Sequence, residues 1–414
     1  MGGTLLLLLV SLSGLMWMGR RAGALGDRLV REANAREQLT WARPSHVVPP
    51  LAGSFTEALD ALMPEVLRFQ VPSETLFGND CNKVARGLAP FEALPPSCLQ
   101  VLDNAKDLLP RVLTATRHEQ GGLPQGLRSS SDPQHPYQAK GKAALRMLIR
   151  LSSLETLRKL SLGQADSAVD TCLDGLALSR EFALGGGLTG SLISAHGYGY
   201  LYPACAQALD AARPERKRQA LEQLARLREG FPPLSLVVQD EAIHTQLVHY
   251  GIMLSEEQRR ELLPQADAIV RNGYGLGVLP GPGALARRHW RASVETFDAM
   301  VASVALPADE RRKALARLDE GLEQRWFKVP PEEAWSLREM TDRLDRQLLR
   351  VEALRTVVEV DLARVEKGTW PPALPPASAQ FLALEVLQPT EAHLKHLDLT
   401  WEEYALVITA DTPP

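Results

Sequence analysis

Residues 145–182 read LRMLIRLSSLETLRKLSLGQADSAVDTCLDGLALSREF, and this stretch decides the fold class. Its first half carries Leu145, Leu148, Leu151 and Leu154 at helical spacing, with further apolar residues on the flanks. Because these side chains cover most of a helix circumference, we expect a helix that is packed on more than one side. Gly163 ends it, and a second helix follows. The pattern predicts two antiparallel helices joined by a short turn.

Helical patterns continue through the rest of residues 137–345. We expect a helix over about 191–211 and another that Pro214 opens at its first position. A further stripe runs from Trp290 to Val304, and Pro307 opens the next helix. The sequence therefore predicts a mainly α fold, with antiparallel helix pairs in a repeat-like array.

Smaller units flank this body. Residues 54–117 form a small helical unit, which begins with a capping box at Ser54-Phe-Thr-Glu57. Residues 118–136 are polar and turn-rich and predict a flexible loop. In residues 346–414 an apolar helical stripe ends at Gly368, and two short strands are expected beyond it. We interpret this last region as a small α+β unit.

The N-terminus carries an uncharged apolar run, Thr4 to Met18, which reads TLLLLLVSLSGLMWM. Such a run is short for a membrane span and normal for the core of a signal peptide. Residues 1–3 hold no cation, and Arg20 and Arg21 precede the small residues that could be cleaved, so we favour an uncleaved anchor in residues 1–26. Residues 27–53 are interpreted as a tether.

The membrane orientation has two readings. Arg20, Arg21, Arg28 and Arg31 follow the apolar run, and the positive-inside rule would keep them in the cytoplasm. The opposite reading needs basic residues upstream of this start. We expect the bacterial inner membrane with a periplasmic body, and a cytoplasmic body stays as the alternative.

The four cysteines bear on the same question. Cys81 and Cys98 are 17 positions apart, in a loop and in the first turn of the next predicted helix. Antiparallel helices can bring such positions within disulfide reach, so we predict that this pair is bonded in an oxidising compartment, and four reduced thiols in a cytoplasmic body are the alternative. Cys172 and Cys205 lie inside predicted helices and are expected to be buried thiols.

Two stretches are candidate functional sites. Glu241 and His244 form a Glu-x-x-His pair on one helix face, but di-iron bundles need a second such pair and two more carboxylates. We therefore expect no metal and no cofactor. The stretch His196-Gly-Tyr198-Gly-Tyr200 could form a pocket wall, or simply allow close helix packing. The net charge of −4 gives no reason to expect nucleic acid.

Two motifs of this sequence resemble motifs of known protein families. The turn Gly163-x-x-Asp166-x-Ala168 resembles the interhelical turn of tetratricopeptide-type repeats. Ala353-Leu354 to Gly368-Thr-Trp370-Pro fits a late helix-Gly-x-aromatic-Pro signature. The ensemble resembles uncharacterised bacterial envelope proteins with an N-terminal anchor and a helical body, a group that implies no catalytic residues. From the repeat-like body and the apolar N-terminal run, the leading functional interpretation is a membrane-tethered scaffold that binds another protein, or an extended peptide, in a groove between helix pairs. The alternatives are an envelope enzyme, with Glu241 and His244 as first suspects, and a purely structural envelope protein.

Overall fold

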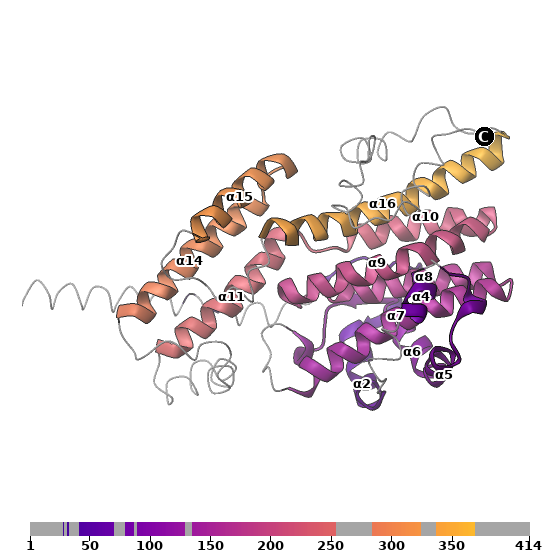
Figure 1. Ribbon diagram of the computed structural model, residues 1–414, viewed down its shortest axis with the longest axis horizontal. Helices are drawn as coiled ribbons and strands as arrows, with labels where there is room; N and C mark the ends of the chain where they lie inside the picture. Colours follow the sequence, from indigo (N-terminus) through magenta and orange to yellow (C-terminus); the bar gives the residue numbers. More distant parts are fainter. Residues whose placement is uncertain are drawn as a thin grey trace, which may run out of the picture.

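The computed structural model describes residues 28, 31–32, 41–69, 79–86, 89–128, 135–253, 284–323 and 337–368. In these ranges the chain is mainly helical, as predicted, with a small sheet beside the helices (Figure 1). None of the described helices is both long and apolar enough to cross a bilayer. The predicted anchor and the strands expected beyond Gly368 lie outside the described residues.

The N-terminal part combines short helices with a small sheet. Its elements are β1 (Trp41–Ala42), β2 (Leu51–Ser54), α2 (Phe55–Arg68), α4 (Asn79–Ala85), η1 (Phe91–Ala93), α5 (Pro96–Asn104), α6 (Leu108–Ala115), β3 (His118–Gly121), η2 (Gln125–Leu127) and η3 (Tyr137–Gly141). β3 lies in the middle of the sheet, antiparallel to β1 and parallel to β2.

Long helices build the rest. They are α7 (Lys142–Ser161), α8 (Ala165–Glu181), α9 (Gly187–Ala211), α10 (Pro214–Glu229), α11 (Leu234–Met253), α14 (Ala284–Val304), α15 (Ala308–Glu323) and α16 (Leu337–Lys367). α9 contacts α7, α8, α11 and α16, so it is the central helix of the molecule. α10 packs on α8 and α16.

The sequence signals for helix ends are confirmed. Ser54 caps α2, because its Oγ accepts a hydrogen bond of 3.1 Å from the Glu57 amide. Gly163 follows α7 with a φ of +72°, the left-handed conformation that glycine adopts without a Cβ penalty. Pro214 is the first residue of α10, and Pro307 directly precedes α15.

The main core forms where α7, α8 and α9 pack together, and it extends to α16 and the N-terminal helices. Leu145, Leu148, Leu151 and Leu154 are all buried, which confirms that α7 is packed on more than one side. α8 and α9 approach closely at Gly197. A Cβ built on that residue would lie 2.0 Å from the Ser179 Oγ, so only glycine fits there.

A second, smaller core lies between α11, α14 and α15. Its buried side chains are Val238, Met300, Val304 and Leu315. Leu188 at the start of α9 packs against it, and α15 also contacts α16. In Figure 1 these helices project from the main body on the left.

α16 joins the main body through polar contacts that are largely buried. Gln347 donates a short hydrogen bond to Ser194 of α9, and Asp361 pairs with Lys217 of α10. Glu352, which is 2% exposed, pairs with Arg228 at an N–O distance of 2.7 Å. Buried pairs of this kind fix the register of a helix more than they stabilise it.

Two sequence interpretations are wrong in part. The tether assigned to residues 27–53 contains β1 and β2, and Arg43 and His46 between them are buried in the body. The loop assigned to residues 118–136 opens with β3, and Leu123 and Leu127 are 0% exposed. Both stretches lack a periodic apolar pattern because they are held by backbone pairing and buried ion pairs.

The contact at Gly197 yields a testable prediction. Gly197→Ala should lower the urea midpoint of unfolding by an amount equivalent to about 1–3 kcal/mol, because the new methyl overlaps Ser179. Gly199→Ala is the control, since its Cβ would meet only the flexible end of Arg350 at 3.3 Å. That change should be neutral or stabilising, because alanine favours a helix by about 1 kcal/mol over glycine. Equal effects of the two substitutions would contradict the close approach.

Candidate functional site

A buried cluster of ionisable side chains lies where the sheet meets the carboxyl end of α8. Glu181, the last residue of α8, is 0% exposed. Its Oε1 accepts from Arg43 Nε at 2.8 Å and from Arg180 Nη2 at 2.9 Å, and its Oε2 accepts from the Gly122 amide at 2.9 Å. Burial raises the pKa of Glu181, but the charges of Arg43 and Arg180 outweigh it and hold that pKa below its usual value.

Arg43 reaches this carboxylate from the segment that follows β1. Its Nη1 donates to the His118 carbonyl at 2.6 Å and its Nη2 to the Thr116 carbonyl at 3.2 Å. The close approach needs Gly121 in β3, because a Cβ there would lie 2.5 Å from Arg43 Nε and 2.7 Å from Glu181 Oε2. The ion pair and the sheet therefore depend on one another.

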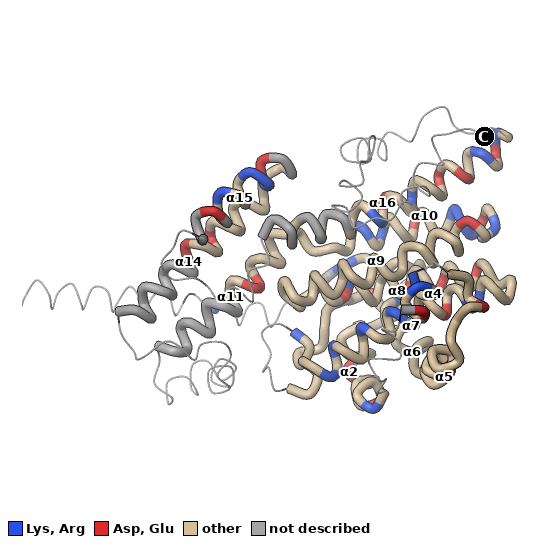
Figure 2. Tube along the Cα trace, viewed as in Figure 1, with Lys and Arg blue, Asp and Glu red and all other residues tan. Residues whose placement is uncertain are grey.

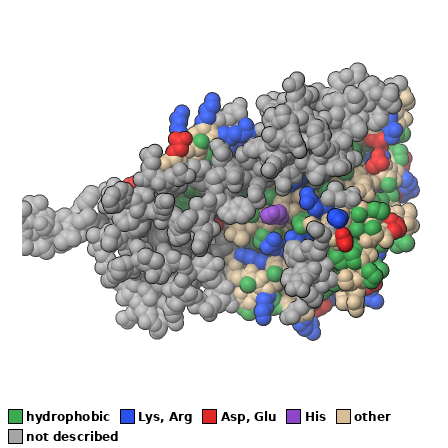
Figure 3. All heavy atoms as spheres, in the orientation of Figure 1, with side chains coloured by type: hydrophobic (Ala, Val, Ile, Leu, Met, Phe, Trp, Pro, Cys, Tyr) green, Lys and Arg blue, Asp and Glu red, His purple; other side chains and the backbone are tan. Residues whose placement is uncertain are grey.

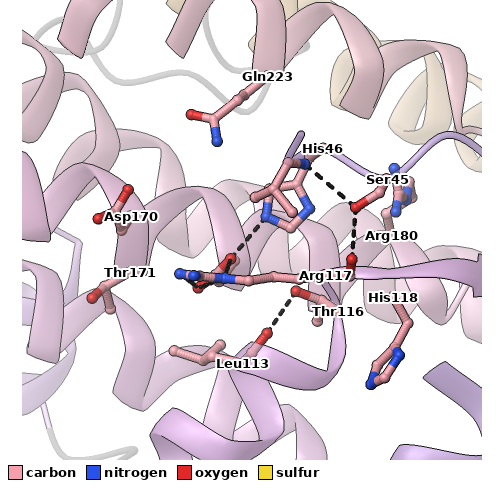
Figure 4. Close-up of polar contacts among 12 residues, drawn as sticks. Ser45, His46, Leu113, Thr116, Arg117, His118, Asp170, Thr171, Arg180 and Gln223 are labelled. Carbon is pink, nitrogen blue, oxygen red and sulfur yellow. Dashed lines mark hydrogen bonds and ion pairs between the residues drawn. The ribbon is translucent and has the colours of Figure 1, made fainter. Parts of the chain in front are cut away.

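A second carboxylate, Asp174, lies two turns earlier on α8. It accepts from Arg117, with an Nη2–Oδ2 distance of 2.6 Å, and from His46 Nε2 at 2.8 Å. Figure 4 shows the His46 ring beside the Arg117 guanidinium, with Ser45 bonded to the Arg117 carbonyl. Burial lowers the pKa of His46, although Asp174 opposes this, so the imidazole is neutral at pH 7. A neutral ring must carry its proton on Nε2 to donate to Asp174.

Arg180 completes the cluster. The side chain is 0% exposed, and its Nε and Nη1 have no hydrogen-bond partner among the described residues. Nη1 lies against Gly230, where a Cβ would be 2.5 Å away, at the carboxyl end of α10. The negative end of that helix dipole and Glu181 therefore face the guanidinium. Tyr198 is equally buried, and burial raises the pKa of its hydroxyl.

The arrangement favours a structural role for this cluster. His46 and Asp174 have the types and spacing of an acid–base pair, but they are 1% and 4% exposed. A general base must come within hydrogen-bond reach of the proton that it removes, and burial denies a substrate that approach. The cluster instead ties β1, β3 and α8 together.

Glu241 is placed by the start of α9. Its Oε2 accepts from the Leu188 amide at 3.2 Å, so the carboxylate binds one of the free amides at the helix amino end. Its charge also acts on Lys142, whose pKa burial lowers to about 8. The helix of His244 is described, but its side chain lies outside the described residues. The structure therefore gives Glu241 of the Glu-x-x-His pair a structural role, as a cap of α9.

The structure separates the residues of the predicted pocket wall. Tyr198 is buried, with its ring centroid 5.3 Å from that of Phe231. His196 is exposed and Tyr200 is half-buried, with the Arg150 guanidinium 4.4 Å from the Tyr200 ring centroid. Together with the tight contact at Gly197, this favours the close-packing alternative for the stretch.

Both cysteine pairs are joined. Cys81 and Cys98 form a disulfide with a Cα–Cα distance of 6.3 Å. Cys172 of α8 and Cys205 of α9 form another, with a Cα–Cα distance of 5.4 Å. The expectation of two buried thiols is wrong because α8 and α9 run side by side and bring these residues face to face, although both are buried as expected.

Neither the described side chains nor the comparisons with known proteins assign a metal site or a family to this chain. Within the described ranges, no group of three or more His, Cys, Asp or Glu side chains could hold a metal ion. No family model matches the chain, and neither a curated protein nor a solved structure is similar to it. The resemblance to bacterial envelope proteins stays a prediction.

Sequence reasoning missed the buried cluster entirely. Arg43 and His46 lie in a stretch without periodicity, and their partners on α8 are 138 and 128 positions away. One signal was present, because Arg180 and Glu181 closely follow the apolar run Leu176-Ala-Leu178 at the end of a helix. An Arg-Glu end of that kind is usually solvated, and only the packing of α10 and β1 buries it.

The buried pair yields a prediction with an exposed control. Glu181→Gln should lower the free energy of unfolding by about 3–5 kcal/mol, because Arg43 and Arg180 lose their buried counter-charge. Glu65→Gln breaks the pair with Arg111, in which Glu65 is 39% and Arg111 52% exposed, and should change the stability little because water screens this pair. Urea unfolding followed by circular dichroism measures both. A small effect at Glu181, similar to that at Glu65, would contradict a stabilising role for the buried contacts of Glu181 with Arg43 and Arg180.

His46 makes stability depend on pH. Its folded pKa is below the ordinary 6.5, so the unfolded chain takes up the proton first as the pH falls. Stability should therefore be lost below about pH 6.5, with a slope of up to about 1.4 kcal/mol per pH unit. His46→Gln keeps a donor for Asp174 but cannot titrate. Urea midpoints between about pH 5 and about pH 7 should fall less steeply for this variant, and an unchanged slope would contradict the assignment.

Proposed function

We propose that this chain is a membrane-tethered helical scaffold of the bacterial envelope that binds another protein or an extended peptide. In this proposal the helix pairs form a repeat-like array. The binding element is the arm, defined as α11, α14 and α15. The predicted anchor in residues 1–26 supplies the tether.

The small core of the arm is the observation that carries the proposal. Among the side chains that the structure describes on α14 and α15, Met300, Val304 and Leu315 form the buried cluster, and Phe297, Val301 and Leu318 pack against it while still partly exposed. A helix pair of this kind gains stability from a neighbour that covers its partly exposed apolar side chains. A partner that binds only the ordered arm would stabilise it by mass action.

The outer side of α15 is suited to such a contact. Its exposed positions include Glu310, Lys313, Arg317 and Glu320, which recur at helical spacing and mix both charges. Mixed charges of this kind select partners and orient them more than they add affinity. Figure 2 shows both blue and red positions on this helix.

Two further observations support a body outside the cytoplasm. Disulfides form and persist in the periplasm and are rare in the cytoplasm, and this chain has two. The apolar run Thr4 to Met18 supplies a route to the membrane.

The enzyme alternative has less support. It relied on Glu241 and His244, and the bond from the Leu188 amide to Glu241 already accounts for that carboxylate as a helix cap. No observation favours a particular reaction.

Site-specific photo-crosslinking in intact cells tests the proposal. A photoreactive residue in place of Lys313 or Arg317 should give one discrete adduct of higher mass, because both positions face outward on the arm. Lys106, exposed between α5 and α6 on the main body, is the matched control and should give none. Mass spectrometry of the adduct identifies the partner. Absence of an adduct at both α15 positions, or an equal adduct at Lys106, would refute the arm as the binding element.

A further inference from the structure

The first half of α7 carries a basic stripe in which Arg146 is exposed and Lys142 and Arg150 are half-buried. From residue 142 to residue 150, the positions that are not buried are Lys142, Ala143, Arg146 and Arg150. The three cations are spaced by four residues and therefore lie on one side of the helix. Figure 2 shows blue positions along α7.

Neighbouring side chains extend the stripe into a surface. Lys140 is exposed just before α7, and on α9 the exposed His196 lies one turn from Tyr200, whose ring Arg150 covers. We name Lys140, Lys142, Arg146, Arg150, His196 and Tyr200 the α7 face. Figure 3 shows Lys and Arg side chains gathered near the middle of the molecule in this view.

The charge of the α7 face is only partly compensated. Lys140 and Arg146 form no ion pair within the described part of the chain. Glu241 acts on Lys142 from α11, and Asp60 on α2 contacts Tyr137 nearby. Burial lowers the pKa of Arg150, Tyr200 opposes this, and the like charge of Arg146 lowers that pKa further. Cations held together against their mutual repulsion attract an anionic partner.

Hydrogen bonds connect the small sheet with the amino end of α7. Trp41, the first residue of β1, pairs with Gly121 of β3. Directly after β3, the Gly126 carbonyl accepts from Gln138 Nε2 at 2.9 Å, and Gln138 Oε1 accepts from Lys142 Nζ at 2.6 Å. β1 is therefore linked, through β3 and Gln138, to the amino end of α7, where the stripe begins.

We propose that the α7 face lies against the anionic headgroups of the membrane that holds the chain. This inference rests on the membrane tether of the proposed function, but not on the protein partner. Guanidinium groups match phosphate oxygens in geometry and charge. A tyrosine beside them is suited to the interface between water and lipid. A basic surface also strengthens an anchor as short as the run Thr4 to Met18.

Acylation of lysines in the full chain tests this. The chain is placed in nanodiscs of zwitterionic lipid alone or with anionic phosphatidylglycerol, and acylation rates are read by peptide mass spectrometry. Lys140 should react about threefold or more slowly in the anionic discs, and salt at about 1 M should remove the protection. Lys106 and Lys313, which are exposed elsewhere, should react equally in both lipids.

Charge-reversal variants complete the test. Arg146→Glu should abolish most of the Lys140 protection, whereas Lys106→Glu should leave it unchanged, and circular dichroism checks that both variants fold. Equal Lys140 rates in the two lipids would overturn the proposal. If the chain fails to enter the discs, the proposed membrane tether is refuted. Sedimentation of the chain with anionic or zwitterionic vesicles then tests whether the α7 face binds anionic lipid. If the chain sediments equally with both kinds of vesicle, the proposal that the α7 face binds anionic headgroups is overturned. Crosslinks at Lys313 test the protein partner of the proposed function separately.

Discussion

The buried carboxylate of Glu181 is the constraint on which the rest of the structure depends. It ends α8, and its two oxygens bind Arg43, Arg180 and the Gly122 amide. Because the group is fully buried, each of these donors must be held in place, or the charge would be left without compensation. The register of β1 against β3, with Trp41 opposite Gly121, delivers Arg43 to the site. One carboxylate thus fixes three segments that are far apart in the sequence.

Apolar packing and buried polar contacts contribute differently to the fold. The leucine-rich interior of α7, α8 and α9 removes apolar surface from water and supplies most of the stabilisation. The buried charges contribute specificity, because a shifted strand or helix would leave at least one of them unpaired. α16 follows the same rule, since Glu352 and Asp361 must meet Arg228 and Lys217 on α10. Arg180, which faces the carboxyl end of α10, links that helix to the cluster.

The sequence predicted those parts of the fold whose pattern is local. The apolar spacing of α7, the cap at Ser54 and the glycine at 163 are features of neighbouring residues, and each is confirmed. The sheet and the buried cluster depend on pairs such as Arg43 and Glu181, which no window of sequence contains. The pairing of Cys172 with Cys205 was missed for the same reason, because it follows from how α8 and α9 are aligned. At Glu241 the sequence indicated a site, whereas the contact with Leu188 shows a helix cap.

The inclusion of β1 in the body limits where that body can lie. If residues 1–26 form the anchor, only residues 27–40 separate it from Trp41, and fourteen residues reach at most about 50 Å. α9 alone, with 25 residues, is about 37 Å long. The body therefore cannot move from the membrane by much more than its own dimensions. Within that reach, the attraction between the cations of α7 and anionic headgroups is strongest when the α7 face lies within about 10 Å of the bilayer, because salt screens it at longer distances.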